Sequence, residues 1–215
     1  HIVEYFHQSD DAYSWLAIQT LEPLLGRYNI EIDFHLVSGA NAKNLPEPEL
    51  AKRLAALDAK KVAPHYGLSL PDSLARVDSD SKALLNKILA ASSDCIVDGM
   101  AVVRQLKSKT LSEMQNAFPK ASDSELKETL SAGDARLTRL SHYSGAMFFY
   151  GDDWYWGVDR LYLLEKRLQR LGLDKEPGRD SCFARPSLES NPGSGEGFTL
   201  EFYASFYSFL FLKNL

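Results

Sequence analysis

Apolar residues at the start of the chain follow first a strand pattern, then a helical one, then a strand pattern again. Residues 1–7, HIVEYFH, are β-branched and aromatic, which is typical of a buried strand. Residues 29–37, NIEIDFHLV, alternate between apolar and polar positions. Residues 12–28 between them predict a helix, because apolar side chains recur at near-helical spacing at Leu16, Ile18, Leu21, Leu24 and Leu25. This order predicts a βαβ unit with parallel strands and a right-handed crossover.

A long helical stretch with polar breaks follows, from about residue 47 to residue 142. Its first part, PEPELAKRLAALDAKKVAPHYG, has prolines at its start and Gly67 at its end, which are common helix boundaries. TLSE at residues 110–113 and SDSE at residues 122–125 are capping boxes, so we expect two further helices to begin there. The whole stretch predicts an all-helical insertion.

The segment after this insertion predicts a hairpin and a final helix. AMFFYGDDWYWG contains two short aromatic strands joined by a turn at Gly151, Asp152 and Asp153. VDRLYLLEKRLQRLG then has helical spacing before Gly172, with leucines at Leu161, Leu164, Leu168 and Leu171. The order βαβ, helices, ββα predicts an α/β fold whose sheet has one antiparallel edge.

Composition and charge narrow the classes of function. The 215 residues are 45% hydrophobic and 25% charged, which is enough for one sizeable core. The formal net charge is -5 and no basic stripe is visible, so we expect no binding to nucleic acid. No apolar run is long enough to span a membrane and no signal peptide is visible, so we expect a cytoplasmic protein without membrane association. Because the chain begins at His1 rather than Met, its natural start could have been trimmed.

Neither the cysteines nor the histidines show the spacing of a metal or redox site. Cys95 and Cys182 lie far apart and neither belongs to a C-x-x-C motif, so a redox pair or a zinc site is not expected. His35, His65 and His142 also lack metal-ligand spacing. We therefore expect no metal site, and two ordinary thiols.

The order of elements resembles the DsbA-like branch of the thioredoxin superfamily. YSWLA at Tyr13–Ala17 and WGVDRLYLLE at Trp156–Glu165 are similar to kappa-class glutathione transferases and 2-hydroxychromene-2-carboxylate isomerases. The resemblance covers about residues 2–171. It implies a thioredoxin-like fold with a helical insertion, glutathione as a cofactor, a small organic substrate, and a homodimer as one assembly to consider.

The turn after the first strand, SDDAYSWL, contains the residues that the resemblance assigns to the active site. Relatives have S-P-Y-S-[WY]-L here, so Asp11 stands at the nucleophile position and Ser14 at the place of the second DsbA cysteine. Thiol–disulfide exchange is excluded at this turn because the turn has no sulfur. Asp11 either serves as a general base for a neutral substrate or only caps the following helix. We expect the helix end to keep Asp11 ionised and to lower its basicity.

Two further features near this turn have alternative interpretations. His7 is either an acid–base partner of Asp10 and Asp11 or a half-buried structural histidine. Four aromatic residues either line a pocket or belong to the core: Tyr143, Trp154, Tyr155 and Trp156.

A second group of candidate residues concerns the binding of glutathione. The resemblance maps a ligand-holding S-D-R motif onto Val158, Asp159 and Arg160, where Asp159 would meet an ammonium group and Val158 lacks the hydroxyl. Alternatively, Asp159 caps the last helix and Arg160 pairs on the surface. Ala146 replaces the cis-proline of the family, so we expect a trans peptide there and a weaker backbone clamp for glutathione. Gly145 leaves room for another group to approach closely.

The chain beyond the final helix divides into two parts. After a domain at residues 1–172, we interpret residues 173–197, which are rich in Pro, Gly and Ser, as a linker. In residues 198–215, LEFYASFYSFL repeats the pattern of VEYFHQSDDAYSWL with three residues fewer. This indicates either the start of a second domain of the same family or an apolar C-terminal strand extension.

Two functions remain open. The first is an enzyme or ligand-binding domain related to glutathione-dependent isomerases and transferases, with Asp11 as the catalytic group and His7 and Ser14 beside it. The second is a catalytically lapsed module that dimerises or supports a second domain. A disulfide oxidoreductase is excluded because C-x-x-C is missing.

Overall fold

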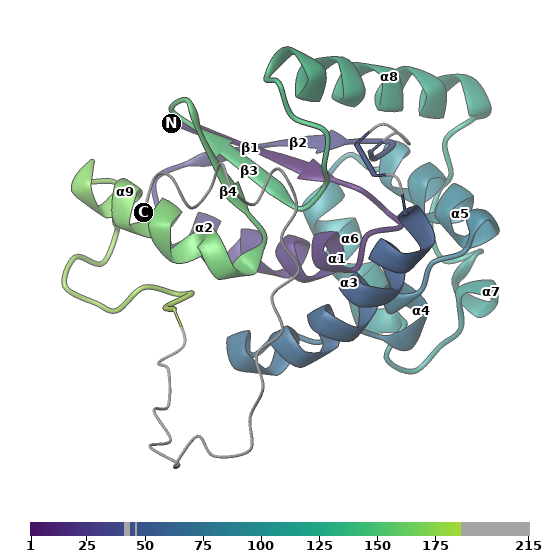
Figure 1. Ribbon diagram of the computed structural model, residues 1–215, viewed down its shortest axis with the longest axis horizontal. Helices are drawn as coiled ribbons and strands as arrows, with labels where there is room; N and C mark the ends of the chain where they lie inside the picture. The colour runs from purple at the N-terminus through teal and green to yellow at the C-terminus, as the bar shows by residue number, and fades with distance from the viewer. Residues whose placement is uncertain (41–43, 46, 186–215) are drawn as a thin grey trace. The chain divides into compact units, whose positions relative to one another are not determined.

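The computed structural model describes residues 1–40, 44–45 and 47–185 (Figure 1). The two alternatives for residues 198–215 therefore lie outside the described residues. In the described part, one mixed sheet has helices on both faces, and a further group of helices lies beyond one end of its strands. This confirms the predicted α/β fold with a helical insertion.

The sheet has four strands in the order β2-β1-β3-β4. They are β1 (Ile2–His7), β2 (Glu31–Leu36), β3 (Met147–Tyr150) and β4 (Asp153–Trp156). β1 and β2 are parallel, with His7 opposite Leu36, whereas β3 is antiparallel to both β1 and β4. The predicted turn between β3 and β4 is confirmed, because Gly151 and Asp152 have positive φ angles of 55° and 69°, as tight hairpin turns require.

The predicted crossover helix at residues 12–28 is divided into two. It consists of α1 (Ala12–Ala17), a 3-10 turn (Ile18–Thr20) and α2 (Leu21–Arg27). Pro23 explains the division, because proline has no N–H to donate and its ring clashes with the carbonyl four residues earlier. In the first turn of α2 neither defect matters, so the second helix begins just before the proline.

The described part of the predicted insertion is a series of helices joined by loops, and the helices range from 4 to 17 residues. The helices are α3 (Pro48–Val62), α4 (Asp72–Ala75), α5 (Ser79–Ala90), α6 (Cys95–Gln105), α7 (Leu111–Met114) and α8 (Asp123–Arg139). Both predicted capping boxes are formed, at Thr110 and Ser122, but the first opens only the single turn of α7. Gly67, with φ of 65°, ends the 3-10 turn that follows α3, as the sequence predicts.

The two faces of the sheet are covered by different parts of the chain. α1, α2 and α9 (Leu161–Arg170) lie on one face, and α8 lies on the other (Figure 1). Tyr5 of β1 belongs to the main core on the α1 side, while the neighbouring Phe6 packs with Leu137 of α8. Gly133 allows α8 to approach β2 closely, because a Cβ there would lie 2.1 Å from the carbonyl oxygen of Leu36. The last element of the insertion therefore returns across the sheet.

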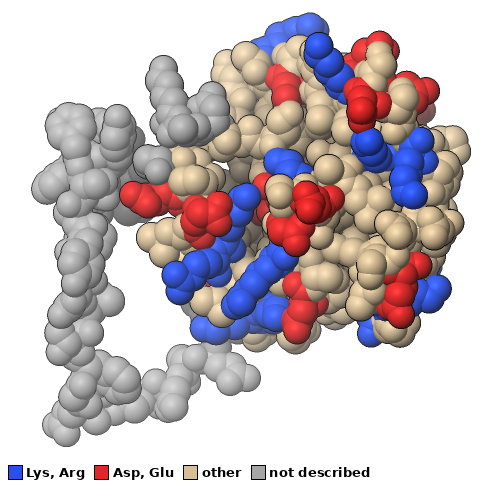
Figure 2. Space-filling model, turned by 90° about the vertical axis from the view of Figure 1, so that its right-hand side faces the viewer, with Lys and Arg blue, Asp and Glu red and all other residues tan. Residues whose placement is uncertain are grey.

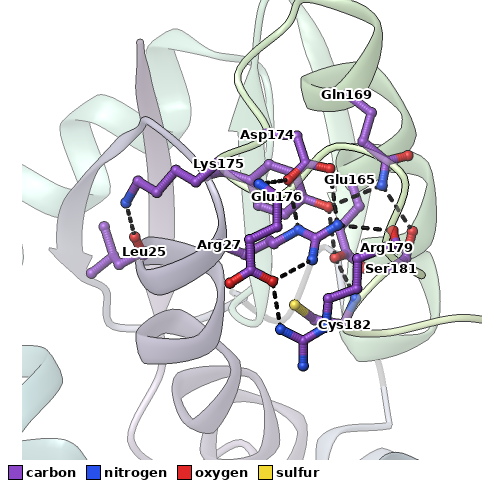
Figure 3. Close-up of polar contacts among 11 residues, drawn as sticks. Leu25, Arg27, Glu165, Gln169, Asp174, Lys175, Glu176, Arg179, Ser181 and Cys182 are labelled. Carbon is purple, nitrogen blue, oxygen red and sulfur yellow. Dashed lines mark hydrogen bonds and ion pairs between the residues drawn. The ribbon is translucent and has the colours of Figure 1, made fainter.

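Residues 173–185, the described part of the segment interpreted as a linker, pack on the domain. Arg27, at the end of α2, has a nearly buried side chain and pairs with Asp174 at 2.7 Å. Glu165 of α9 is fully buried and accepts hydrogen bonds from the backbone N–H groups of Cys182 and Phe183 at 2.7 and 2.8 Å. Figure 3 shows the contacts of Arg27 with Asp174 and of Glu165 with Cys182. The sequence did not indicate this packing, because the contacts join residues that lie apart along the chain.

The outer surface mixes charges of both signs. On the face that Figure 2 shows, Lys and Arg side chains lie among Asp and Glu side chains. Among the residues that the structure describes, no helix has the length and apolar character needed to cross a membrane.

Replacing Glu165 with Gln should lower the free energy of unfolding by about 2–3 kcal/mol, because an amide nitrogen would face N–H groups that need an acceptor. Urea denaturation measures this, with Glu22→Gln as the control at an exposed site on α2. The control should change stability by less than about 0.5 kcal/mol. Equal losses in the two variants would contradict the role of Glu165 in holding the 173–185 segment.

Candidate active site

The turn between β1 and α1 is organised around the side chain of Asp11. Asp11 caps α1, with Oδ1 accepting from the N–H of Tyr13 at 3.3 Å and Oδ2 from the N–H of Ser14 at 3.0 Å. The Oγ of Ser14 donates to the same Oδ2 at 2.8 Å, and it accepts from the N–H of Gln8 at 3.2 Å. Asp11 therefore caps α1, and a serine hydroxyl is held directly against its carboxylate.

The acidity of Asp11 is opposite to the expectation from sequence. Burial raises the pKa of its carboxyl from 3.8 to about 6, despite the hydrogen bonds from Ser14 and Tyr13. The negative charge of Asp10 contributes in the same direction. The expected lowering is therefore wrong, because the loss of hydration outweighs the helix N-terminus. A carboxyl group with this pKa can both take up and release a proton near neutral pH.

Asp10, the neighbouring residue, is held ionised. Its side chain is 6% exposed and lies between the ammonium groups of Lys52 and Lys82, at 3.0 and 2.9 Å. Burial alone would raise the pKa of Asp10, but hydrogen bonds and charges from the two lysines bring it below its usual value. Two adjacent carboxyls with opposite pKa shifts are typical of sites in which acid and base roles are separated.

A cavity of about 490 Å³ lies over this turn. Both aspartates, Tyr13 and the two lysines line it, together with a wall of small apolar residues from α3 and the loop before it: Leu45, Pro48, Ala51 and Ala55. Tyr143 and Trp156, which are 44% and 54% exposed, add aromatic surface. The lining therefore combines an apolar wall with a few charged groups, as small-molecule sites usually do.

A second hollow of about 440 Å³ shares Tyr13 and Trp156 with the first cavity. It includes Asp159 and Arg160, which pair with one another at 3.0 Å and are both half-exposed. Asp159 makes no side-chain cap of the last helix, whereas Arg160 does pair on the surface. The predicted cap by Asp159 is therefore wrong, and the predicted pairing of Arg160 on the surface is confirmed.

His7 does not form the acid–base pair considered from the sequence. Its ring is fully buried against Trp15 and Phe34, and its Nδ1 lies 3.1 Å from the hydroxyl of Tyr5. Burial lowers its pKa to about 3, so the ring is neutral. Within the described part of the chain it has no hydrogen bond to Asp10 or Asp11. His7 is a core residue, more deeply buried than the half-buried alternative.

Gly145 and Ala146 lie in the loop just before β3. All peptide bonds in the described part of the chain are trans, as predicted at Ala146, which has a left-handed φ of 54°. A Cβ at Gly145 would lie 2.5 Å from Cβ of Gln8 and 2.9 Å from Oγ of Ser14. The close approach that Gly145 permits is therefore made by the chain's own side chains. The carbonyl of Ala146 accepts from the N–H of Gly157 at 2.9 Å and is also used internally.

The aromatic residues near the hairpin divide between pocket and core. Trp156 and Tyr143 line the cavity, whereas Tyr155 is buried in the main core. Trp154 packs against Phe6 and His142 on the other face of the sheet. The alternation of side chains along β4 places Trp154 and Tyr155 on opposite faces of the sheet.

Sequence reasoning missed the groups that come from the insertion. Lys52 and Lys82 lie on α3 and α5, and Asp58 of α3 accepts from the hydroxyl of Tyr13 at 2.6 Å. Burial and the carboxylate of Asp58 raise the pKa of this hydroxyl, which keeps it protonated. No local motif marks such residues, because only the tertiary fold brings them to the turn.

One cluster of potential metal ligands lies outside this site. Single ligand atoms of Glu4, Asp33 and His35 lie within 4.8 Å of one another. However, both oxygens of Glu4 accept from Arg136 at 2.6 Å, and a guanidinium in this position opposes a cation. The cluster is better described as an ion-pair network between the sheet and α8.

Comparisons with known proteins support the fold. No protein-family model matches the chain, and no curated protein matches its sequence. A solved structure of selenomethionine-labelled 2-hydroxychromene-2-carboxylate isomerase aligns with a TM-score of 0.53, 17% identity, and coverage of 80% of this chain and 96% of the other. The chain has a DsbA-like thioredoxin fold. In this fold the candidate site lies at the turn after the first strand.

Replacing Asp11 with Asn should remove a pH dependence of stability, while Asn still caps α1. Below pH 3.8 the carboxyl is protonated in the folded and unfolded chains alike. As the pH rises to about 6, the unfolded chain loses the proton first, so the wild type loses up to about 3 kcal/mol relative to the variant.

Urea denaturation at several values between about pH 4 and about pH 7 measures this difference. Asp80→Asn, at an exposed site in the first turn of α5, is the control for the loss of a surface carboxylate. A constant difference between Asp11→Asn and wild type over this range would contradict the raised pKa.

Proposed function

We propose that this domain binds a small organic molecule in the cavity over the β1–α1 turn and that Asp11 moves a proton on it, as in an isomerisation. The observation that carries the proposal is the pair of adjacent carboxyls in one cavity, with Asp10 held ionised and the pKa of Asp11 raised to about 6. Asp11 accepts the proton in its ionised form and returns it in its protonated form. The hydroxyl of Ser14 stabilises the ionised form by donating to it.

The lining suggests an aromatic anion as the substrate class. Lys52 and Lys82 bring two ammonium groups into the cavity, and these are the groups that would bind a carboxylate, although they also pair with Asp10. The apolar wall and Trp156 suit an aromatic ring. The name of the structural neighbour refers to 2-hydroxychromene-2-carboxylate, an aromatic carboxylate, so this compound is a suitable first test substrate.

Glutathione is the cofactor that we propose to test. The adjoining hollow presents Asp159 to an ammonium group and Arg160 to a carboxylate. The loop at Gly145 and Ala146 supports glutathione less well, because Gln8 and Ser14 fill the space at Gly145. The cofactor is therefore an independent part of the proposal, and turnover is to be measured with and without it.

The alternative is a catalytically lapsed module. Ser14 is fully buried, and Asp11 accepts three hydrogen bonds from its own turn. These features are also those of a helix cap whose role is structural. Activity measurements distinguish the two functions.

The wild type should convert 2-hydroxychromene-2-carboxylate, and the rate should rise as the pH passes through about 6, where Asp11 becomes a base. Asp11→Asn should reduce the rate by about 10²–10⁴-fold, the usual contribution of a general base. The isomerisation is followed by absorbance, and Asp80→Asn is the control, with an unchanged rate.

Equal rates for wild type and Asp11→Asn would contradict the catalytic role of Asp11. Glutathione binding is measured separately by quenching of Trp fluorescence, with Trp156→Phe to identify the reporting residue, since Trp156 lines both hollows. A flat titration up to millimolar glutathione would remove the cofactor from the proposal. Restoration of thiol-dependent activity by Asp11→Ser would instead mark a lapsed site.

A further inference from the structure

Helix α3 exposes a continuous row of leucines. Leu50, Leu54 and Leu57 are 50%, 57% and 52% exposed. Their spacing of four and three residues places them along one line of the helix surface, which we call the leucine stripe. The opposite side of α3 is buried through Ala56 and Ala59. The helix therefore contacts the domain through small residues and turns its largest apolar side chains outward.

Such an arrangement differs from ordinary surface exposure. Single exposed leucines are normal on soluble proteins, whereas an aligned group indicates a contact surface. The other side of the same helix lines the cavity through Ala51 and Ala55 and directs Lys52 to Asp10. Whatever covers the leucine stripe therefore also supports one wall of the candidate site.

The charges at the two ends of α3 indicate what covers it. Glu47 and Glu49 lie at its start, and Lys60 and Lys61 lie at its end. A parallel neighbour with the same sequence would bring like charges together at both ends. An antiparallel neighbour with the same sequence brings acidic residues against basic ones at both ends, and it also opposes the two helix dipoles.

The register of such a pair follows from the spacing. With Leu54 on a two-fold axis, each Glu47 lies opposite Lys61 of the second copy. Leu50 and Leu57 of one helix then lie opposite Asp58 and Ala51 of the other. Each is therefore one residue away from a leucine of the second copy, Leu57 or Leu50, and the two leucine stripes interleave. The contact is self-complementary, as a two-fold interface requires.

We propose that a second copy of this chain covers the leucine stripe, with the two α3 helices antiparallel about Leu54. A helix of 15 residues is about 22 Å long, so the contact is small. A contact of this size is at the low end of specific protein–protein interfaces, so we expect a weak dimer. The pairing is independent of the function proposed for the cavity.

Sedimentation velocity of the 215-residue chain between about 1 and about 200 µM tests the pairing. The wild type should change from monomer to dimer within this range. Leu54→Lys should raise the dissociation constant by at least about 100-fold, because two charges would meet at the axis. Leu163→Lys, at another exposed leucine on α9, is the matched control and should leave the dimer intact.

Charge exchange tests the register. Glu47→Lys and Lys61→Glu should each weaken the dimer by about 5- to 10-fold, because each brings like charges together. The double variant should restore it, because the opposite charges then face each other with their signs exchanged. Circular dichroism and thermal melting confirm that each variant is folded.

Three results would overturn the proposal. A wild type that stays monomeric over the whole concentration range excludes the dimer. A dimer that is insensitive to Leu54→Lys, or that the double variant fails to restore, uses another surface or register. Protection of the leucine stripe from hydroxyl-radical labelling in the monomer would show that another part of the same chain covers it.

Discussion

The parallel pairing of β1 with β2 is the constraint on which the rest of the structure depends. Parallel strands end at the same edge of a sheet, so the turn after His7 and the chain after Leu36 meet there. The insertion starts from that edge, and α3 and α5 therefore bring Lys52 and Lys82 to Asp10. Sites of α/β sheets are commonly found at the carboxyl ends of their strands for the same geometric reason.

The candidate site is built from polar groups that are costly to bury. Asp10 remains ionised because two ammonium groups replace its water, whereas Asp11 has only uncharged donors, and its pKa rises. His7, which is fully buried at the end of β1, is neutral because burial disfavours its charged form. The pKa values of these three residues are shifted differently, and each shift follows from how well the protein replaces the water that the group lost on burial.

Buried polar groups also stabilise the packing of residues 173–185 on the domain. Glu165 and Arg27 are buried side chains that bind the 173–185 segment, which has no hydrophobic pattern of its own. The segment is held by polar contacts between residues about 150 positions apart, such as Arg27 and Asp174, and by the burial of Leu173 and Phe183 in the main core. α3 shows the complementary case, with its inner side resting on alanines and its leucines facing outward.

The sequence by itself determined the features that depend on neighbouring residues. The capping boxes at Thr110 and Ser122, the turn at Gly151 and the helix ends at Gly67 and Gly172 follow from local backbone requirements. The βαβ unit and the helical insertion follow from periodicity, and the resemblance directed attention to Asp11 at the turn after the first strand.

Only the tertiary structure decided the properties that depend on distant residues. The pKa of Asp11, the lysines around Asp10, the filled space at Gly145 and the packing of residues 173–185 all changed the picture drawn from the sequence. The hydration and the charge state of a side chain depend on all atoms within a few ångströms, including those of residues far away along the chain. A motif can therefore locate the site, while its acidity and its free space are determined by the fold around it.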